Sequence, residues 1–311
     1  MGVIRWCIGI AAALALIVLV IAYICFRMAF YISDKEKKEN AARELPPGKE
    51  YLPYHGAMTA WQKEVRTFPC ETVSIRSFDS LTLHGKYYER FPGAPIELMF
   101  HGYRGNAMRD LCGGVQRCFA CGRNALLVDQ RASGESGGNV ITFGIRERKD
   151  CLAWVDFMVR HFGPDVKIIL TGISMGAATV LMAAGEELPD NVIGVLADCG
   201  YTSAKDIICK EIGRMGLPEK LSYPFVKLGA RLFGGFDPDE CAPVEAVKRA
   251  KVPVIFFHGE NDDFVPCDMS RRIYEVCASR KHLHTVPGAA HGLAFPADEE
   301  TYLKVLREFF P

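Results

Sequence analysis

Ser174 is the residue whose surroundings most clearly suggest chemistry. It lies between Gly172 and Gly176 in a Gly-x-Ser-x-Gly motif, after the apolar run 167–170 and before small, helix-forming residues such as Ala177. This order predicts a strand, a sharp turn and a helix, which is the setting that exposes a serine hydroxyl above a sheet. The glycines leave room where backbones approach too closely for a Cβ. A serine that merely caps a helix is the alternative for this motif alone.

A base and an acid in later segments would turn this serine into a nucleophile. A serine hydroxyl needs a positioned base, and the base needs an acid to fix its tautomer and stabilise its charged form. Residues 257–266 contain Asp262 and Asp263 just past an apolar run, and residues 286–292 contain His291 in the same kind of position. The chain order serine, acid, histidine is one that serine hydrolases use.

The elements that must position these residues alternate between apolar strands and helices. Strands without polar alternation, separated by helices, predict a largely parallel sheet covered on both faces. Ligands of such sheets bind beyond the carboxyl ends of the strands. The candidate residues that follow an expected strand are His101, Ser174, Asp198, Asp262 and His291. We expect a hairpin at 72–76 and 80–88, strands at 96–100, 125–128, 192–196, 252–257 and 282–286, and helices at 54–67, 107–121, 143–160, 269–279 and 298–310.

Five motifs together carry a resemblance to a known family. They are His101-Gly-Tyr-Arg-Gly-Asn106, the loop 129–136, the Ser174 motif, Gly259-x-x-Asp262-x-x-Val265-Pro266 and Gly288-Ala-Ala-His291. Over residues 70–311 the sequence resembles the α/β-hydrolase superfamily, in its serine-aminopeptidase-like and acyl-esterase-like branch. It is most similar to bacterial single-pass hydrolases of that type. The resemblance implies an α/β-hydrolase fold, with Ser174 as nucleophile, Asp262 as acid and His291 as base.

Neighbouring candidates must be separated from this triad. Asp263 lies one residue away from the Gly-x-x-Asp-x-x-Val-Pro position, so we favour Asp262 as the acid. Asp198 also follows a strand, but we expect a structural or pocket-lining role for it. His101 and His258 each precede a glycine at a strand end, and we expect them to be structural.

The tetrahedral intermediate of acyl transfer needs two backbone donors. We expect them to be the N–H of Met175, which follows the nucleophile, and the N–H of Tyr103 in the loop after the third strand. The ring of Tyr103 is placed to line the pocket, and Arg131 is expected to tie loops together near the site. No cofactor is required by this chemistry, and the histidines show no zinc-ligand spacing.

Composition excludes some classes of function. The 311 residues carry a formal net charge of zero, and no basic stripe points to nucleic acid. The twelve cysteines are scattered, several of them in apolar runs, so we expect most to be free thiols. Cys118 and Cys121 form a single Cys-x-x-Cys pair on an expected helix, which we attribute to chance.

The N-terminal segment predicts a membrane anchor. Residues 6–26 form an uncharged apolar run bounded by Arg5 and Arg27. At 1.5 Å per residue such a run spans roughly 30 Å, the thickness of one bilayer core. A cleaved signal peptide is the alternative, but the run is long and no small-x-small cleavage site or lipobox is evident. More cations follow the run than precede it, which favours a catalytic domain on the cytoplasmic side.

The resulting division of the chain is an anchor at 1–32, a charged tether at 33–50 and an α/β-hydrolase domain at 51–311. Residues 202–241 interrupt the strand–helix rhythm, and we expect them to form a small helical cap over the pocket. The expected activity is hydrolysis of an ester, thioester or amide, most simply a carboxylester, with a small acyl ester or peptide as substrate. A serine peptidase of the same fold and a non-catalytic binding protein are the alternatives.

Overall fold

An eight-stranded sheet forms the centre of the protein, which is described here over residues 2–310 of a computed structural model. The strand order is β1-β2-β4-β3-β5-β6-β7-β8, and β1 and β2 form an antiparallel hairpin at one edge. β2 pairs antiparallel with β4, whereas the remaining neighbours pair in parallel. The α/β fold expected from the sequence is confirmed. The strands are β1 (Glu71–Arg76), β2 (Thr82–Tyr88), β3 (Ile96–Phe100), β4 (Asn124–Val128), β5 (Ile168–Ile173), β6 (Val192–Asp198), β7 (Val254–Gly259) and β8 (Lys281–Val286).

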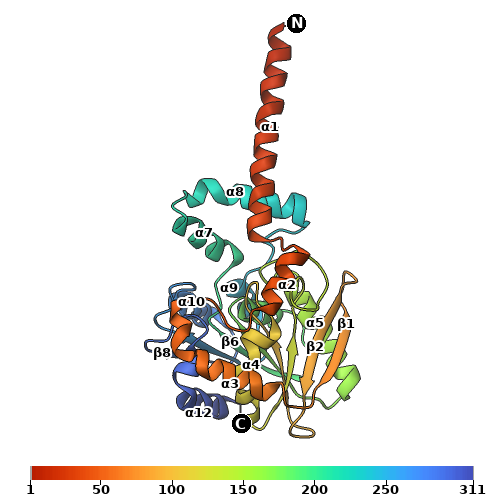
Figure 1. Cartoon of the computed structure of the whole chain (residues 1–311), viewed down its shortest axis with the longest axis vertical. Helices are drawn as coiled ribbons and strands as arrows, with labels where there is room; N and C mark the ends of the chain where they lie inside the picture. The colour runs from red at the N-terminus through yellow and green to blue at the C-terminus, as the bar shows by residue number, and fades with distance from the viewer. Residues whose placement is uncertain (1, 311) are drawn as a thin grey trace.

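Helices cover both faces of this sheet (Figure 1). Alternate residues of β7 show the two-sided burial: Val254 and Phe256 join one apolar cluster, and Ile255 and Phe257 join another. The first cluster includes residues of α5, α6 and α10, and the second includes residues of α3, α11 and α12. The helices are α1 (Gly2–Ala29), α2 (Asp34–Ala42), η1 (Lys49–Tyr54), α3 (His55–Val65), α4 (Ala107–Ala120), α5 (Glu147–Phe162), α6 (Met175–Ala183), α7 (Ala204–Arg214), α8 (Glu219–Gly229), η2 (Ala230–Gly234), α9 (Pro243–Ala246), η3 (Val247–Arg249), α10 (Cys267–Val276), α11 (Ala294–Ala297) and α12 (Glu299–Phe309).

The turn between β5 and α6 is sharp and strained. Ser174 has φ 57° and ψ −117°, a conformation that side chains other than glycine rarely adopt. A Cβ on Gly172 would overlap the carbonyl group of Gly176, and a Cβ on Gly176 would overlap that of Phe100. The two glycines therefore allow β3, β5 and α6 to meet closely enough to hold Ser174 in this conformation.

The C-terminal end of α1 is part of the folded domain. Ala22, Phe26 and Phe30 are buried, and Phe30 makes edge-to-face contacts with Phe143 and Phe236. The backbone N–H of Ile141 donates to the carbonyl oxygen of Phe30 at 2.8 Å. By contrast, residues 3–21 are exposed and project from the domain as one long helix (Figure 1). This helix is long and apolar enough to cross a membrane, a property that it shares with a signal sequence.

Two further segments lie at the carboxyl edge of the parallel strands. Helix α2 begins with a capping box, in which Ser33 and Glu36 bond each other's backbone N–H groups, and the chain then continues along the edge of the domain through η1. Helices α7 and α8 and the π-helical turn η2 stand above the domain next to α1 (Figure 1). They occupy most of the segment in which a cap is expected.

One helix begins later than its sequence suggests. Helix α5 starts at Glu147, four residues after the expected start at Phe143. The carboxylate of Glu147 accepts the backbone N–H groups of Thr142 and Gly144 at 2.8 and 2.9 Å, and Gly144 has a φ of +91°. These bonds stabilise a turn before the helix, and apolar periodicity alone does not reveal them.

Replacing Gly176 with alanine tests the close packing under Ser174. We expect Gly176→Ala to destabilise the protein by about 1–3 kcal/mol, as overpacking does, because the new methyl must displace the backbone of β3. Thermal unfolding of the full chain in detergent measures this change. Gly56→Ala is the control, since no atom lies within 4 Å of the added Cβ. Equal melting temperatures for the two variants would contradict this account of the turn.

Candidate active site

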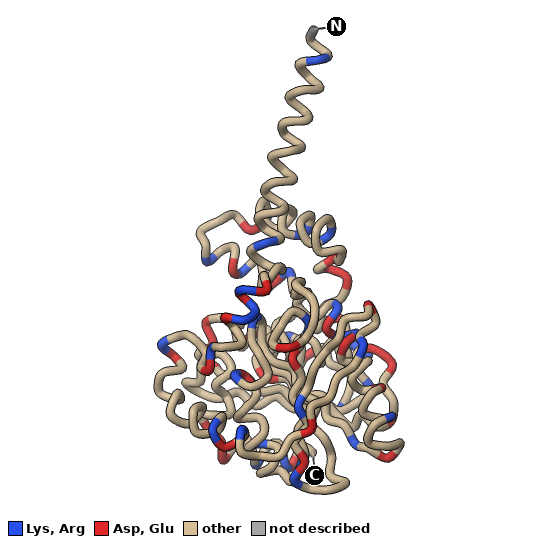
Figure 2. The backbone as a smooth tube through the Cα atoms, turned by 45° about the vertical axis from the view of Figure 1, so that its right-hand side comes forward, with Lys and Arg blue, Asp and Glu red and all other residues tan. Residues whose placement is uncertain are grey.

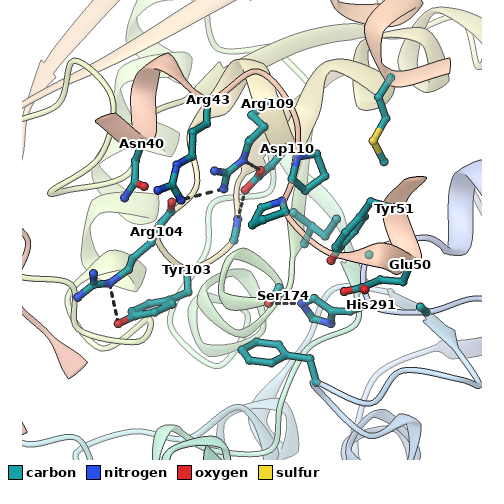
Figure 3. A pocket seen from close by; sticks show the side chains of 18 of the residues that line it. Asn40, Arg43, Glu50, Tyr51, Tyr103, Arg104, Arg109, Asp110, Ser174 and His291 are labelled. Atoms are coloured by element: carbon teal, nitrogen blue, oxygen red, sulfur yellow. Dashed lines mark hydrogen bonds and ion pairs between the residues drawn. The ribbon is translucent and has the colours of Figure 1, made fainter. Parts of the chain in front are cut away.

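The structure brings Ser174, His291 and Asp262 together in one hydrogen-bonded chain. Nε2 of His291 lies 2.9 Å from Oγ of Ser174, and Nδ1 lies 2.6 Å from Oδ2 of Asp262. Figure 3 shows the Ser174 hydroxyl directed at the imidazole. With Nδ1 donating to the carboxylate, Nε2 is free to accept the serine proton. This is the arrangement that a serine nucleophile with a histidine base requires.

The Asp262 carboxylate at the end of this series of hydrogen bonds is held by its own loop. Oδ1 of Asp262 accepts the backbone N–H groups of Phe264 and Val265 at 2.9 and 2.7 Å. Burial alone would raise the pKa of Asp262, but hydrogen bonds and charge from His258 and His291 lower it to about 2. The carboxylate is therefore ionised over the whole physiological range. The adjacent Asp263 lies in the pocket wall, and its side chain has no hydrogen bond to His291.

His258 contacts the same oxygen of Asp262 as His291 does. It is fully buried, with Nδ1 2.6 Å from Oγ of Ser270 and Nε2 2.8 Å from the carbonyl oxygen of Val265. Nε2 also lies 3.2 Å from Oδ2 of Asp262. The sequence indicated a structural histidine but not this contact. The only sequence signal for this contact is the position of His258 near the end of β7, four residues before Asp262.

The loop after β3 lies directly against the serine. A Cβ on Gly102 would stand 3.6 Å from Cβ of Ser174 and 3.9 Å from its Oγ. His101 shapes this loop: its Nδ1 bonds the carbonyl oxygen of Gly102 at 2.8 Å, and its Nε2 accepts the backbone N–H of Gln130 at 3.0 Å. His101 is buried, and neither of these two hydrogen bonds involves Ser174. Its position therefore fits the structural role expected for it.

Tyr103 connects the same loop to the end of α1. Its hydroxyl donates to the carbonyl oxygen of Ala29 at 2.8 Å, and Nε of Arg104 donates to that hydroxyl at 2.9 Å. Nη2 of Arg104 also bonds the carbonyl oxygens of Met28 and Tyr31, at 3.1 and 3.0 Å. The last carbonyl groups of a helix lack partners within it, so these two side chains cap α1. Sequence reasoning placed the Tyr103 ring in the pocket wall, which the structure shows, but did not find the link to α1.

A cavity of about 730 Å³ opens above Ser174 and His291. Its walls come from α2 and the following segment, from loops at the carboxyl ends of the strands, and from Arg214 at the end of α7. Figure 3 shows charged side chains of both signs around it. The charged lining residues that come from the N-terminal segment and from residues 104–110 are Glu36, Glu39, Arg43, Glu50, Arg104, Arg109 and Asp110.

Two other expected residues lie outside this pocket. Asp198 lines a second, smaller cavity, and its Oδ2 accepts the hydroxyl of Tyr302 at 3.2 Å. Burial raises the pKa of Asp198 to about 6, against the opposing influence of His258. Arg131 bonds both oxygens of Asp150 at 2.7 Å and also pairs with Asp79. It thereby ties the 129–136 loop to α5 and to the β1–β2 turn.

Among the residues that the structure describes, one group of three side chains has atoms that could bind a metal ion and that lie close together. They belong to Cys199, Asp262 and His291, and the atoms lie within 4.8 Å of one another. Burial raises the pKa of Cys199 well above its ordinary value, so its sulfur is a neutral thiol. A thiol is a poor zinc ligand, and the imidazole and carboxylate already bond each other.

Comparison with known proteins identifies the family of this chain. The sequence model of the prolyl oligopeptidase family matches residues 142–311, more than half of the chain. The chain belongs to this family. It is a serine hydrolase of the α/β-hydrolase superfamily, and the superfamily inferred from the motifs is confirmed.

Relatives and solved structures extend the comparison. The uncharacterized protein YqkD of Bacillus subtilis is 24% identical, with 96% of this chain and 94% of that protein covered. Protein bem46 of Schizosaccharomyces pombe is 25% identical over 77% of this chain and 76% of its own. The Pyrococcus furiosus esterase Pf2001 shares the fold with a TM-score of 0.64 at 22% identity, over 79% of this chain and 92% of the esterase. An acylaminoacyl peptidase of Pyrococcus horikoshii has a TM-score of 0.56 at 20% identity, over 80% of this chain and 42% of that one.

Removing the charge of Asp262 should have a much larger effect than the same change next to it. We expect Asp262→Asn to lower kcat by about 10⁴-fold, because an amide neither fixes the required imidazole tautomer nor stabilises the imidazolium. Initial rates with a p-nitrophenyl acyl ester measure the change. Asp263→Asn is the matched control and should leave kcat nearly unchanged. The assignment of the acid is wrong if Asp263→Asn is the variant that loses activity.

The link between Tyr103 and α1 can be tested without removing the Tyr103 backbone N–H. We expect Tyr103→Phe to lower kcat by about fivefold with little change in KM. The substitution removes one hydrogen bond that holds the loop, and a bond worth about 1 kcal/mol corresponds to about a fivefold change in rate. Steady-state kinetics on the same ester separate the two parameters. Tyr201→Phe removes a comparable bond, to the carbonyl oxygen of Phe143, and should leave kcat unchanged. Equal kinetic effects of the two substitutions would show that the Tyr103 bond does not position the loop.

Proposed function

We propose that this protein is a membrane-anchored carboxylester hydrolase with Ser174 as nucleophile, His291 as base and Asp262 as acid. The observation that carries the proposal is the continuous hydrogen-bonded chain from Asp262 through His291 to the serine hydroxyl, at the floor of a cavity large enough for a small acyl substrate. A matching motif or a matching fold class would not by itself show that these three side chains are within hydrogen-bonding distance of one another.

The reaction follows from the positions of these groups. Oγ of Ser174 attacks the ester carbonyl carbon while Nε2 of His291 takes its proton, and the carbonyl oxygen becomes an oxyanion. The backbone N–H groups of Met175 and Tyr103 are the proposed donors to that oxyanion. As the intermediate collapses, the bond to the leaving oxygen breaks, and His291 returns the proton to the departing alcohol. Water then attacks the acyl-enzyme by the same route and releases the acid.

An ester is the favoured substrate for two reasons. Of the two solved structures compared above, the Pf2001 esterase has the higher TM-score, 0.64 against 0.56 for the acylaminoacyl peptidase. In addition, the cavity opens beside the N-terminal segment, which places an acyl substrate close to the proposed membrane anchor.

A serine peptidase that acts on free N-termini is the second candidate. The matching family is named for a peptidase, and two carboxylates in the cavity wall, Glu39 and Glu50, have the charge needed to hold a substrate ammonium group. Aminoacyl p-nitroanilides and p-nitrophenyl acyl esters offered side by side separate the two activities. A higher kcat/KM for the anilides, lost in Glu50→Gln, would favour the peptidase.

We further propose that α1 stays attached as the anchor. Phe26 and Phe30 are buried in the domain, and the hydroxyl of Tyr103 caps the carbonyl group of Ala29. Ala22 is buried as well, and its carbonyl oxygen lies close to Gly229 of α8, so a signal peptide removed near residue 25 would take away a packed part of the domain. The cations after the helix, together with the free cysteines, favour a domain on the cytoplasmic side.

Alanine at position 174 tests the nucleophile. We expect Ser174→Ala to abolish hydrolysis of p-nitrophenyl esters and labelling by a fluorophosphonate probe, because both reactions need the serine oxygen. Gel fluorescence and absorbance measure the two readouts, and an unchanged melting temperature shows that the fold persists. Ser279→Ala, outside the cavity lining, should retain both activities. A wild-type protein that fails to react with the probe would instead be a non-catalytic binding protein.

A further inference from the structure

Helix α8 has an apolar face that the protein leaves uncovered. Tyr223 and Val226 of this helix, and Ala230 just after it, are buried against the domain. At about 100° per residue, the opposite side of the helix carries a row of large apolar residues. This row, called the α8 stripe below, consists of Leu221, Phe225, Leu228 and Leu232. Leu221 is 69% exposed and Leu232 is 53% exposed, whereas Phe225 and Leu228 between them are half-buried, so the stripe is uncovered chiefly at its two ends.

The helix that carries the stripe packs directly on α1. A Cβ on Gly229 would overlap the carbonyl oxygen of Ala22, so the two backbones are in close contact. Just beyond α8, Phe233 meets Tyr23 edge to face with ring centroids 5.2 Å apart. Figure 1 shows that α8 lies across α1 rather than along it. If α1 crosses a bilayer, α8 therefore runs along the surface of that bilayer.

The position of this crossing along α1 matches the dimensions of a membrane. Residues 3–21 extend beyond α8 and are exposed, and at 1.5 Å per residue they span roughly 30 Å, the thickness of a hydrocarbon core. The same stretch is uncharged from Trp6 onward, and Figure 2 shows it as a continuous tan tube. The boundary between lipid and water then falls at the level of α8, where its apolar stripe is exposed.

We propose that the α8 stripe inserts into the interface of the same bilayer that α1 crosses. The partner is the lipid surface, because α8 packs on α1 at Ala22, where the exposed apolar part of α1 leaves the domain. Lys220 lies beside the stripe and suits an anionic headgroup, whereas the nearby Arg231 already pairs with Asp237. The inference rests on the proposed anchoring of α1. It makes the cap, whose Arg214 lines the cavity, a second membrane contact that holds the pocket mouth at the headgroup level.

Lipid photocrosslinking of the full chain tests this proposal. The photoreactive residue p-benzoylphenylalanine replaces Leu221 in one protein, Leu14 of α1 in a second and Val276, on the far side of the domain, in a third. Each is reconstituted in vesicles of phosphatidylcholine and phosphatidylglycerol, irradiated and analysed by mass spectrometry. Fluorophosphonate labelling confirms that each variant is folded. We expect lipid adducts at position 221 at least about tenfold above those at 276, because an interfacial helix buries its apolar face about 5–10 Å deep.

The control at Leu14 separates failure of this proposal from failure of the anchor. Lipid adducts at 14 and 221 but not at 276 support the proposal. Adducts at 14 without adducts at 221 overturn it and leave the anchor in place. Crosslinks from 221 to a second copy of the chain also overturn it, since the stripe would then be an interface between protein molecules. No lipid adduct at 14 overturns both the anchor and the inference that rests on it.

Discussion

The close packing of backbones beneath Ser174 is the constraint on which the rest of the site depends. Gly172 and Gly176 lie where any Cβ would overlap a neighbouring carbonyl group, and only this proximity keeps Ser174 at a positive φ. This conformation places the hydroxyl above the carboxyl edge of the sheet, where the loops that follow β3, β7 and β8 also lie. The imidazole of His291 can reach the serine because the parallel strands bring these loops to the same edge.

The end of α1 gives the protein a feature that the hydrolase fold does not itself require. Phe26 and Phe30 contribute to the core of the domain, and Tyr103 and Arg104 cap the last carbonyl groups of the helix. Because Tyr103 belongs to the loop beside the nucleophile, the helix and the site share hydrogen bonds. The segment 33–50, expected as a tether, also lines the cavity through residues such as Arg43 and Glu50. The N-terminal segments therefore build part of the pocket.

Electrostatics distinguishes the carboxylates near the site. Asp262 accepts backbone N–H groups and bonds two histidines, so its charged form is favoured and its pKa falls to about 2. Asp198 is buried as well, but among the described residues the Tyr302 hydroxyl is its only hydrogen-bond donor, and burial raises its pKa to about 6. The two aspartates thus differ in pKa because of the donors around them. An ionised acid beside His291 is what a histidine base needs.

The sequence by itself determined the sheet, the order of its strands along the chain and the candidate residues Ser174, Asp262 and His291. Apolar runs, glycine spacing and chain order are signals in the sequence itself, and they can be recognised without knowledge of the fold. The tertiary structure decided which groups touch: the contact of His258 with Asp262, the capping of α1 by Tyr103, and the α8 stripe. These features join residues from different elements, or depend on which face of a helix is covered. Local pattern cannot specify them, because such contacts arise only when the packed sheet brings distant loops to one edge.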